Sequence, residues 1–473
     1  MQAGIAAALL PSARLVAAPT AANAIVLNDA SRLNPTPVAK VAILSGRDEE
    51  NLLASLRNEL REAAKEGRPV AVGGARHSMG GQSLARGGTA VSLETSIVKP
   101  DVAANVYRVG AGARWREVLA ALDPLQLSPA VMQSNNDFSI GGTLSVNAHG
   151  WPVPFGPFGT TVKSFRMLLA DGELVTCSRD QNADLFSLAV GGYGLFGVII
   201  DAELAAASNW SLRARPARLP SDEFTKAFID AANQPLNAML YGRLSVSRDN
   251  FLRDALMVAY RSDGFQPTVA KAGKPSAAYA YLSRNIFRAQ TGSETGKKPR
   301  WLVETRLTAT VSPSVTRNEL LNHPVAEFAD SNFRRTDILH EYFVPPERLE
   351  DFLAGCREII PRHSQDLLSV TLRYVGGDES SVLAYAAGPR IAAVMLFVQP
   401  MTPEANQDMQ AMTAKLIDHV LSLGGSFYLP YRLHATRAQV RRAYPRAEEF
   451  IAAKRRFDPN LLFRNTLWDR YFG

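Results

Sequence analysis

Two glycine-rich loops constrain the fold of this chain more than any other feature of its sequence. The loop at residues 73–81, GGARHSMGG, has four glycines in nine positions and directly follows a short apolar run. The segment 139–143, SIGGT, is a second compact glycine turn. Such loops can turn consecutive backbone N–H groups inward and bind an anion without a lysine. Two of them on one domain would suit a diphosphate, whereas each alone can be no more than a tight turn.

A third glycine segment, Gly192–Gly197, has the sequence GYGLFG and matches the GxGxxG fingerprint of dinucleotide-binding folds. That fingerprint works when a strand enters it and a helix leaves it, because the pyrophosphate then meets the helix N-terminus. Here a helix is expected before the motif and a strand after it. We therefore reject a Rossmann site and assign these glycines to a tight turn with close backbone approach.

The composition is that of an ordinary globular chain, with 46% hydrophobic and 21% charged residues, which excludes a disordered or collagen-like protein. The 473 residues suggest about three domains. No run reaches the ~18 apolar residues of a membrane-spanning helix, so no integral membrane segment is expected. Two cysteines, Cys177 and Cys356, exclude a disulfide framework and a four-thiolate zinc site, and no metal site is expected. The net charge of +7 favours anionic partners in general.

Hydrophobic periodicity predicts an α+β chain. Helices are expected at 48–67, 115–122, 183–190, 221–233, 347–360 and 403–423. Strands are expected at 69–73, 89–93, 105–109, 165–170, 173–177, 198–204, 239–245, 255–260, 368–375 and 391–398. The change to longer helices between strand pairs from about residue 209 indicates a second α+β block.

Residues 1–25 differ from the rest of the chain. A short apolar run is followed by an Ala-Asn-Ala pattern at 22–24, typical of an export signal, but no basic residue precedes the run. The segment is interpreted as an export signal or a flexible leader. The expected location is therefore periplasmic or secreted, and otherwise cytoplasmic.

Other polar features carry less information. His77, inside the first glycine loop, can cap its own turn, or its neutral imidazole can act as a nucleophile or base beside a cofactor; spacing does not decide between them. The basic clusters at 441–442 and 454–456 lack interleaved aromatic residues and are interpreted as a solvated face, so no nucleic-acid partner is expected. The sequence has no GxSxG elbow, HExxH motif or Walker A loop.

Four ordered motifs resemble the vanillyl-alcohol-oxidase type of FAD-linked oxidoreductase, whose FAD-binding domain is of the PCMH type. They are PVAVGGARHSMGGQS at 69–83, SIGGTLSVNAHG at 139–150, GELVTCSRDQNADLFSLAVGGYGLFGVI at 172–199 and FDPNLLFRN at 457–465. Their order and their spread over the chain make the resemblance far more specific than any single glycine loop.

The resemblance implies an α+β fold with a two-lobed PCMH-type FAD-binding domain at residues 36–208. An α+β substrate cap with an antiparallel sheet would occupy 209–425, and the segment 426–473 would return to the FAD domain and help close the site. It further implies FAD as cofactor, a small-molecule substrate, and an electron acceptor that is oxygen, a quinone or a cytochrome. The residues expected to bind FAD are Gly73, Gly74, Ala75, Arg76, His77, Ser78, Ser139, Gly141, Gly142, Thr143, His149, Gly197, Val198 and Asn465.

In many members of this family the histidine at the position of His77 is bonded to the flavin 8α-methyl group, and the sequence of residues 75–78 resembles those members. The bond needs a neutral imidazole nitrogen, prevents loss of the cofactor and raises its reduction potential. Berberine-bridge-type relatives add a cysteinyl link, but neither Cys177 nor Cys356 lies at a matching place. A single histidyl bond is therefore expected.

The resemblance is less specific about the substrate. Residues 141–204 are most similar to cytokinin dehydrogenases, which use an aspartate several residues before the GGT turn, but Asp137 lies closer to that turn than their spacing allows. The cap and tail instead resemble alditol and aldonolactone oxidases in EYFVP at 341–345, TLR at 371–373 and HATR at 434–437. In that pattern, an acidic residue stands where this chain has Thr371, and a lysine stands where it has Arg437. The implied catalytic residues are His434, Arg373 and Arg437, although Arg373 can instead face solvent from an alternating strand.

The sequence thus predicts an FAD-dependent oxidase or dehydrogenase that oxidises a CH–OH group of a sugar, polyol or lactone by hydride transfer to flavin N5. His434 is the expected base, because an imidazole can accept a proton at neutral pH. Thr371 in place of a carboxylate indicates a less hydroxylated substrate, or an anionic one suited to Arg373 and Arg437. The alternatives are an amine-oxidising enzyme of the cytokinin-dehydrogenase type and a non-redox flavin-fold transferase, as in alkyl-glycerone-phosphate synthases. A binding module without catalysis would require a colourless protein.

Overall fold

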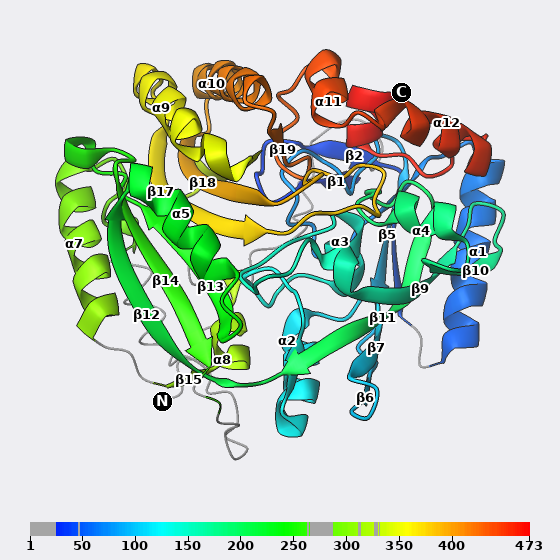
Figure 1. Ribbon diagram of the computed structural model, residues 1–473. Coiled ribbons are helices and arrows are strands. Elements are labelled where there is room, and N and C mark those ends of the chain that lie inside the picture. The colour runs from blue at the N-terminus through cyan, green and yellow to red at the C-terminus, as the bar shows by residue number, and fades with distance from the viewer. Residues whose placement is uncertain are drawn as a thin grey trace, which may run out of the picture.

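A computed structural model describes residues 25–45, 48–262, 264, 287–310, 314–325, 330 and 332–473. Residues 1–24 of the expected leader lie outside the described residues. The predicted α+β fold is confirmed: the described residues form four sheets with helices packed on them (Figure 1).

Three parallel strands and one amphipathic helix form the lobe that carries the first glycine loop. In sheet order the strands are β3 (Lys40–Ser45), β5 (Thr89–Glu94) and β4 (Val70–Val72), and the helix is α1 (Glu49–Lys65). Leu52, Leu56 and Leu60 lie at helical spacing and are buried, so this face of α1 belongs to the core. A short pair of strands, β1 (Ile25–Leu27) and β2 (Thr36–Val38), precedes the lobe.

The second lobe is a six-stranded antiparallel sheet. Its path is β10 (Leu174–Ser178), β9 (Val162–Leu168), β11 (Val198–Ser208), β7 (Val106–Gly110) and β6 (Val98–Asp101), with β8 (Leu127–Pro129) on β11. Its helices are α2 (Trp115–Leu122), α3 (Ile140–Ser145) and α4 (Ala183–Ala189). The GYGLFG segment lies between α4 and β11, so the reversed order that excludes a Rossmann site is confirmed. The prediction of a simple turn at 139–143 is wrong, because these residues begin α3.

An eight-stranded antiparallel sheet follows, here called the cap sheet. Its order is β15 (Val315–Thr316), β12 (Ser211–Pro220), β14 (Asp254–Ser262), β13 (Asn237–Leu244), β17 (Asp366–Val375), β18 (Arg390–Pro400), β16 (Arg335–Val344) and β19 (Ser426–Phe427). Its helices are α5 (Ser221–Ala232), α7 (Glu294–Thr310), α8 (Arg317–Leu321), α9 (Leu349–Ile359) and α10 (Pro403–Ser422). Helices α5, α9 and α10 lie against this sheet (Figure 1).

The C-terminal segment returns to the first lobe through α11 (Arg437–Ala443) and α12 (Ala447–Phe457), drawn in red in Figure 1. The Val70 N–H donates to the Leu462 carbonyl (2.6 Å), and the Arg464 N–H donates to the Val70 carbonyl (3.0 Å). The chain end therefore extends the parallel sheet beside the first glycine loop. The interpretation of 454–456 as a solvated face is wrong for Lys454, which is fully buried.

Candidate active site

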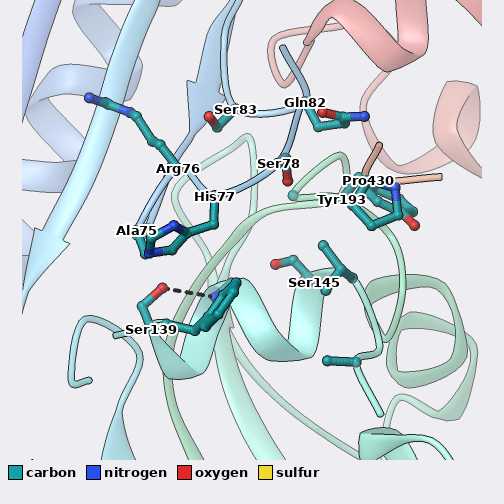
Figure 2. Close-up of a pocket in the computed structure, with 18 of the residues that line it drawn as sticks. Ala75, Arg76, His77, Ser78, Gln82, Ser83, Ser139, Ser145, Tyr193 and Pro430 are labelled. Carbon is teal, nitrogen blue, oxygen red and sulfur yellow. Dashed lines mark hydrogen bonds between the residues drawn. The ribbon is translucent and has the colours of Figure 1, made fainter. Parts of the chain in front are cut away.

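One pocket collects residues that are far apart in the sequence (Figure 2). Its walls come from the first glycine loop, the segment from α3 to His149, residues 193–199, the cap strands β16 and β17, and residues 428–431. The two lobes, the cap sheet and the returning C-terminal segment therefore all contribute to one site.

The first glycine loop presents backbone to the pocket. Within the described residues, none of the five backbone N–H groups of residues 74–78 donates to another protein atom. Arg76 has a positive φ of 54°, whereas Ala75 and His77 on either side of it do not. A backbone in which the sign of φ alternates in this way turns successive N–H groups toward one side. Its side chain points away from the pocket (Figure 2), and its Nη2 donates to Ser92 Oγ at 3.1 Å. This loop thus has the form of an anion-binding nest.

The start of α3 forms the facing wall. Ser139 is the N-cap, and its Oγ accepts from the Gly142 N–H at 3.3 Å, the dashed line in Figure 2. A Cβ atom on Gly74 would lie 1.9 Å from Ser139 Oγ, so the two glycine loops touch only because residue 74 has no side chain. Together they form a continuous wall of backbone that a phosphate group can approach closely.

His77 lies where the two loops meet. Its ring is 4.4 Å from that of Phe138, between ring centres. Burial, and then the charge of Arg114, lower the pKa of His77 to about 4. The imidazole is therefore neutral at pH 7, as a nucleophilic nitrogen requires.

A buried polar cluster forms the cap side of the pocket. The His149 Nε2 atom pairs with Glu341 Oε1, and Tyr431 donates to Glu341 Oε2 at 3.1 Å. Burial raises the pKa of Glu341, but its interactions with His149, Arg373 and Tyr431 outweigh that effect and hold the pKa below its usual range. Glu341 is thus an ionised carboxylate inside the protein. Tyr428 lines the same end.

The structure places the three expected catalytic residues in different parts of the molecule. Arg373 lines the pocket and is half-buried, with its Nε shielded from solvent. His434 is not part of the lining; its Nδ1 lies 3.0 Å from Thr413 Oγ1 of α10, and burial, followed by Arg432, lowers its pKa to about 2. Arg437 begins α11 on the surface and donates to the Arg470 carbonyl. The structure thus brings only Arg373 of these three to the site.

Most of the expected FAD-binding residues line the pocket: Gly73, Gly74, Ala75, Arg76, His77, Ser78, Ser139, Gly141, Gly142, His149 and Gly197. Three lie behind the wall. Thr143 Oγ1 accepts from Trp115 Nε1 (2.9 Å), Asn465 Nδ2 donates to the Tyr193 carbonyl (2.9 Å), and Val198 is fully buried at the start of β11. Of these contacts, the bond from Asn465 reaches a residue of the pocket lining, Tyr193.

Sequence reasoning did not single out Glu341, Tyr428 or Tyr431. Glu341 opens the EYFVP segment that carries the resemblance to sugar oxidases, and this was the one available signal. The tyrosines lie in a segment whose return to the pocket depends on the pairing of β19 with β16. Their proximity comes from tertiary structure and not from any local pattern.

The pocket fits FAD on two observations. The wall formed by the glycine loops lacks side chains where a diphosphate would lie. Three buried polar atoms of its lining have no hydrogen-bond partner within the described residues: Ser83 Oγ, His149 Nδ1 and Arg373 Nε. Buried polar groups normally find partners, and FAD offers phosphate, ribose and ring acceptors and donors.

Neither a metal site nor a membrane-spanning helix is present in the described residues. No group of three or more His, Cys, Asp or Glu side chains is placed to hold a metal ion. No helix in the described ranges is both long and apolar enough to cross a bilayer.

Comparison with known proteins identifies the first part of the chain. Residues 53–178 match the family described as "FAD binding domain". An "Uncharacterized oxidoreductase ORF5 in fasciation locus" from Rhodococcoides fascians is 31% identical over 210 residues, which are 44% of this chain and 48% of that protein. "Cytokinin dehydrogenase 3" of Arabidopsis thaliana is 36% identical over 29% of this chain and 27% of its own length. "Cytokinin dehydrogenase 1" of Oryza sativa subsp. japonica is 35% identical over 34% and 32%.

The chain thus spans less than half the length of these curated relatives. The matched domain, the α+β fold and the glycine-walled pocket agree with one another. They show an FAD-binding domain in the first part of the chain, and they make the chain similar to an oxidoreductase and to cytokinin dehydrogenases.

Proposed function

We propose that this chain is an FAD-dependent oxidoreductase that oxidises a CH–OH group of a small hydroxylated substrate of the sugar, polyol or lactone type. The observation that carries the proposal is the buried pair of His149 and Glu341 at the cap end of the glycine-walled pocket. FAD, when bound, supplies the acceptor for the hydride of the substrate carbon.

The chain supplies the proton acceptor. If the His149 Nε2–H donates to the ionised Glu341, the other ring nitrogen, Nδ1, carries a lone pair, and it has no partner within the described residues. This arrangement of carboxylate and imidazole is the one that prepares a histidine to take a hydroxyl proton and stabilises the imidazolium that results. His149 replaces His434 as the proposed base, because His434 is held outside the pocket.

The test is a Glu341→Gln variant. We expect kcat with the best alcohol substrate to fall about 10²- to 10⁴-fold, the usual contribution of general acid–base catalysis, while FAD content stays unchanged. Glu347→Gln is the control, because Glu347 is exposed and lies outside the pocket lining. An unchanged kcat in Glu341→Gln would remove the pair from the proposal.

Amine oxidation is the second candidate, favoured by the relatives named cytokinin dehydrogenase. Asp137 offers no carboxylate to an amine in the pocket, because its Oδ2 accepts from the Val325 N–H at 2.6 Å and its Oδ1 lies 3.4 Å from Arg116. Stopped-flow reduction of the bound flavin decides between the candidates. Reduction by an amine and by none of a panel of sugars, polyols and lactones would overturn the CH–OH proposal.

We further propose that His77 bonds covalently to the flavin 8α-methyl group. Its buried, neutral ring and its place between the two glycine loops support this. Acid precipitation of the purified protein should leave the yellow colour in the pellet, and His77→Ala should release it into the supernatant. Colour already in the supernatant of the parent protein would contradict the bond and leave non-covalent FAD binding intact.

A further inference from the structure

Arg373 is a cation of the pocket lining that has no carboxylate in contact with it within the described residues. It lies on β17 and is half-buried, and its Nη2 donates to Ser134 Oγ at 2.7 Å. Its Nε has no hydrogen-bond partner within the described residues. Within the same part of the chain, no Asp or Glu oxygen lies within 4.0 Å of its guanidinium nitrogens, whereas Arg243 on the neighbouring strand β13 is bonded to Glu304 at 2.9 Å.

A guanidinium without a carboxylate in contact is costly in this position, and the charge of Glu341 acts on it only from a distance. Burial opposes its charge and lowers its pKa, but arginine stays protonated in proteins. Buried ions are normally compensated by a counter-ion and by hydrogen bonds to all their donors. Glu341, on the same face of the cap sheet, already accepts from His149 and Tyr431. Arg373 thus retains donor capacity directed at whatever enters the pocket.

We propose that Arg373 binds a carboxylate of the substrate, so that the substrate is a hydroxylated carboxylic acid. This rests on the proposed function and narrows its substrate class. Glu341 and Arg373 lie on strands β16 and β17, with β18 between them, and Arg373 is displaced by two residues along the strand, so their backbones are about 12 Å apart. Both side chains line the same pocket, where a small hydroxy acid or sugar acid would place its carboxylate on the guanidinium and its hydroxyl at His149. A planar carboxylate matches the paired donors of a guanidinium.

The test uses the FAD-loaded full chain and redox-inert ligands. Acetate, propanoate and benzoate are titrated against acetamide, propanamide and benzamide at fixed ionic strength, and the flavin absorbance spectrum reports binding. We expect each carboxylate to bind about tenfold to a hundredfold more tightly than the amide of the same shape, as charge-assisted hydrogen bonds require. The parent protein alone therefore tests the proposal, even if a variant fails to fold.

Variants of Arg373 test whether this residue causes the preference for carboxylates. Arg373→Gln should abolish the preference for carboxylates, and Arg373→Lys should retain part of it, since a lysine keeps the charge but not the planar fork. Arg215→Gln is the matched control: an exposed arginine on β12 of the same sheet, whose loss should change nothing.

Equal binding of carboxylates and amides by the parent protein would overturn the proposal. A preference that survives Arg373→Gln, together with a changed flavin midpoint potential, would also overturn it and assign the guanidinium to the cofactor. A purified protein that neither contains FAD nor takes it up would instead refute the proposed function. Calorimetric titration with propanoate and propanamide would then still decide whether Arg373 binds an anion.

Discussion

At the scale of single residues, the site requires a position without a side chain, Gly74. Gly74 allows the first glycine loop to touch Ser139 at the start of α3. An alanine there would place its Cβ 1.9 Å from Ser139 Oγ and 3.1 Å from Ser139 Cβ, so the loops would have to separate or Ser139 would have to release its cap on Gly142.

We therefore expect Gly74→Ala to lower the FAD content of the purified chain by at least about tenfold, since loss of the cap alone costs about 1 kcal/mol and the wall is displaced in addition. The measurement is the ratio of bound FAD to polypeptide. Gly388→Ala is the control, because the nearest atom to a Cβ there is 3.8 Å away. Normal FAD content in Gly74→Ala would show that the two loops do not grip the cofactor together.

Residue types also explain what the sequence could and could not predict about the site. Glycine loops and the histidine inside them are local patterns, so they were found without a structure. The pairing of His149 with Glu341 joins residues 192 positions apart and leaves no local signal. His434 illustrates the converse: its motif suggested a catalytic role, but its side chain packs against Thr413 of α10.

At the scale of elements, the returning C-terminal segment is fastened by a buried ion pair. Lys454 of α12 pairs with Asp458, and its Nζ also donates to the Leu195 carbonyl at 2.6 Å. Asp458 accepts in addition from the N–H groups of Leu462 (2.9 Å) and Phe463 (2.8 Å), which fixes the turn that pairs with β4. The run of basic residues at 454–456 suggests a solvated face, but the segment that covers Lys454 lies more than 250 positions away in the chain.

Loss of the Asp458 carboxylate should lower the stability of the fold. Asp458→Asn leaves the ammonium of Lys454 buried without a counter-ion, and we expect the free energy of unfolding to fall by about 3–5 kcal/mol. Urea unfolding followed by fluorescence measures this. Lys226→Met is the control, because Lys226 forms the same i, i+4 contact with Asp230 at an exposed position and its loss should leave the urea midpoint unchanged. Equal changes of the urea midpoint in the two variants would show that the buried pair stabilises the fold no more than the exposed one.

At the scale of the whole molecule, the cap sheet lines the pocket with one face and packs against α10 with the other. The alternation along β16 directs Glu341 to the pocket and His340 to α10, where its Nε2 lies 3.3 Å from Thr413 Oγ1. The same Thr413 contacts His434, so two neutral histidines join the cap to the C-terminal segment. Burial, and then Arg432, lower the pKa of His340 to about 3 and that of His434 to about 2.

These histidines should make the fold sensitive to acid. Below about pH 6.5 the unfolded chain takes up protons at both imidazoles and the folded chain does not, so stability is complete above that pH and is lost as pH falls toward the folded values. At pH 5 the expected loss is about 2 kcal/mol for each ring. Urea unfolding at pH 7.5 and pH 5 measures it, and His340→Gln should show a drop smaller by about that amount. An equal loss of stability between pH 7.5 and pH 5 in the parent protein and in His340→Gln would show that His340 does not cause the sensitivity to acid.

The arrangement of secondary structure was largely predictable, because most helices and strands carry their own periodicity, as the leucines of α1 do. The order of the strands was not, since the pairing of β13 with β17 and of β19 with β16 joins segments separated by long stretches of chain. The pocket exists only after that pairing. Its glycine wall was therefore predicted from sequence, whereas at its cap end only His149 and Arg373 were predicted and Glu341, Tyr428 and Tyr431 were not.

The central claim is that the glycine-walled pocket holds one FAD, and the flavin content of the purified full chain tests it most directly. The visible absorbance, compared with the polypeptide concentration, should give about one flavin per chain in the parent protein, either as purified or after addition of FAD, and far less in Gly74→Ala. A parent protein that is colourless and takes up no added FAD would contradict the account.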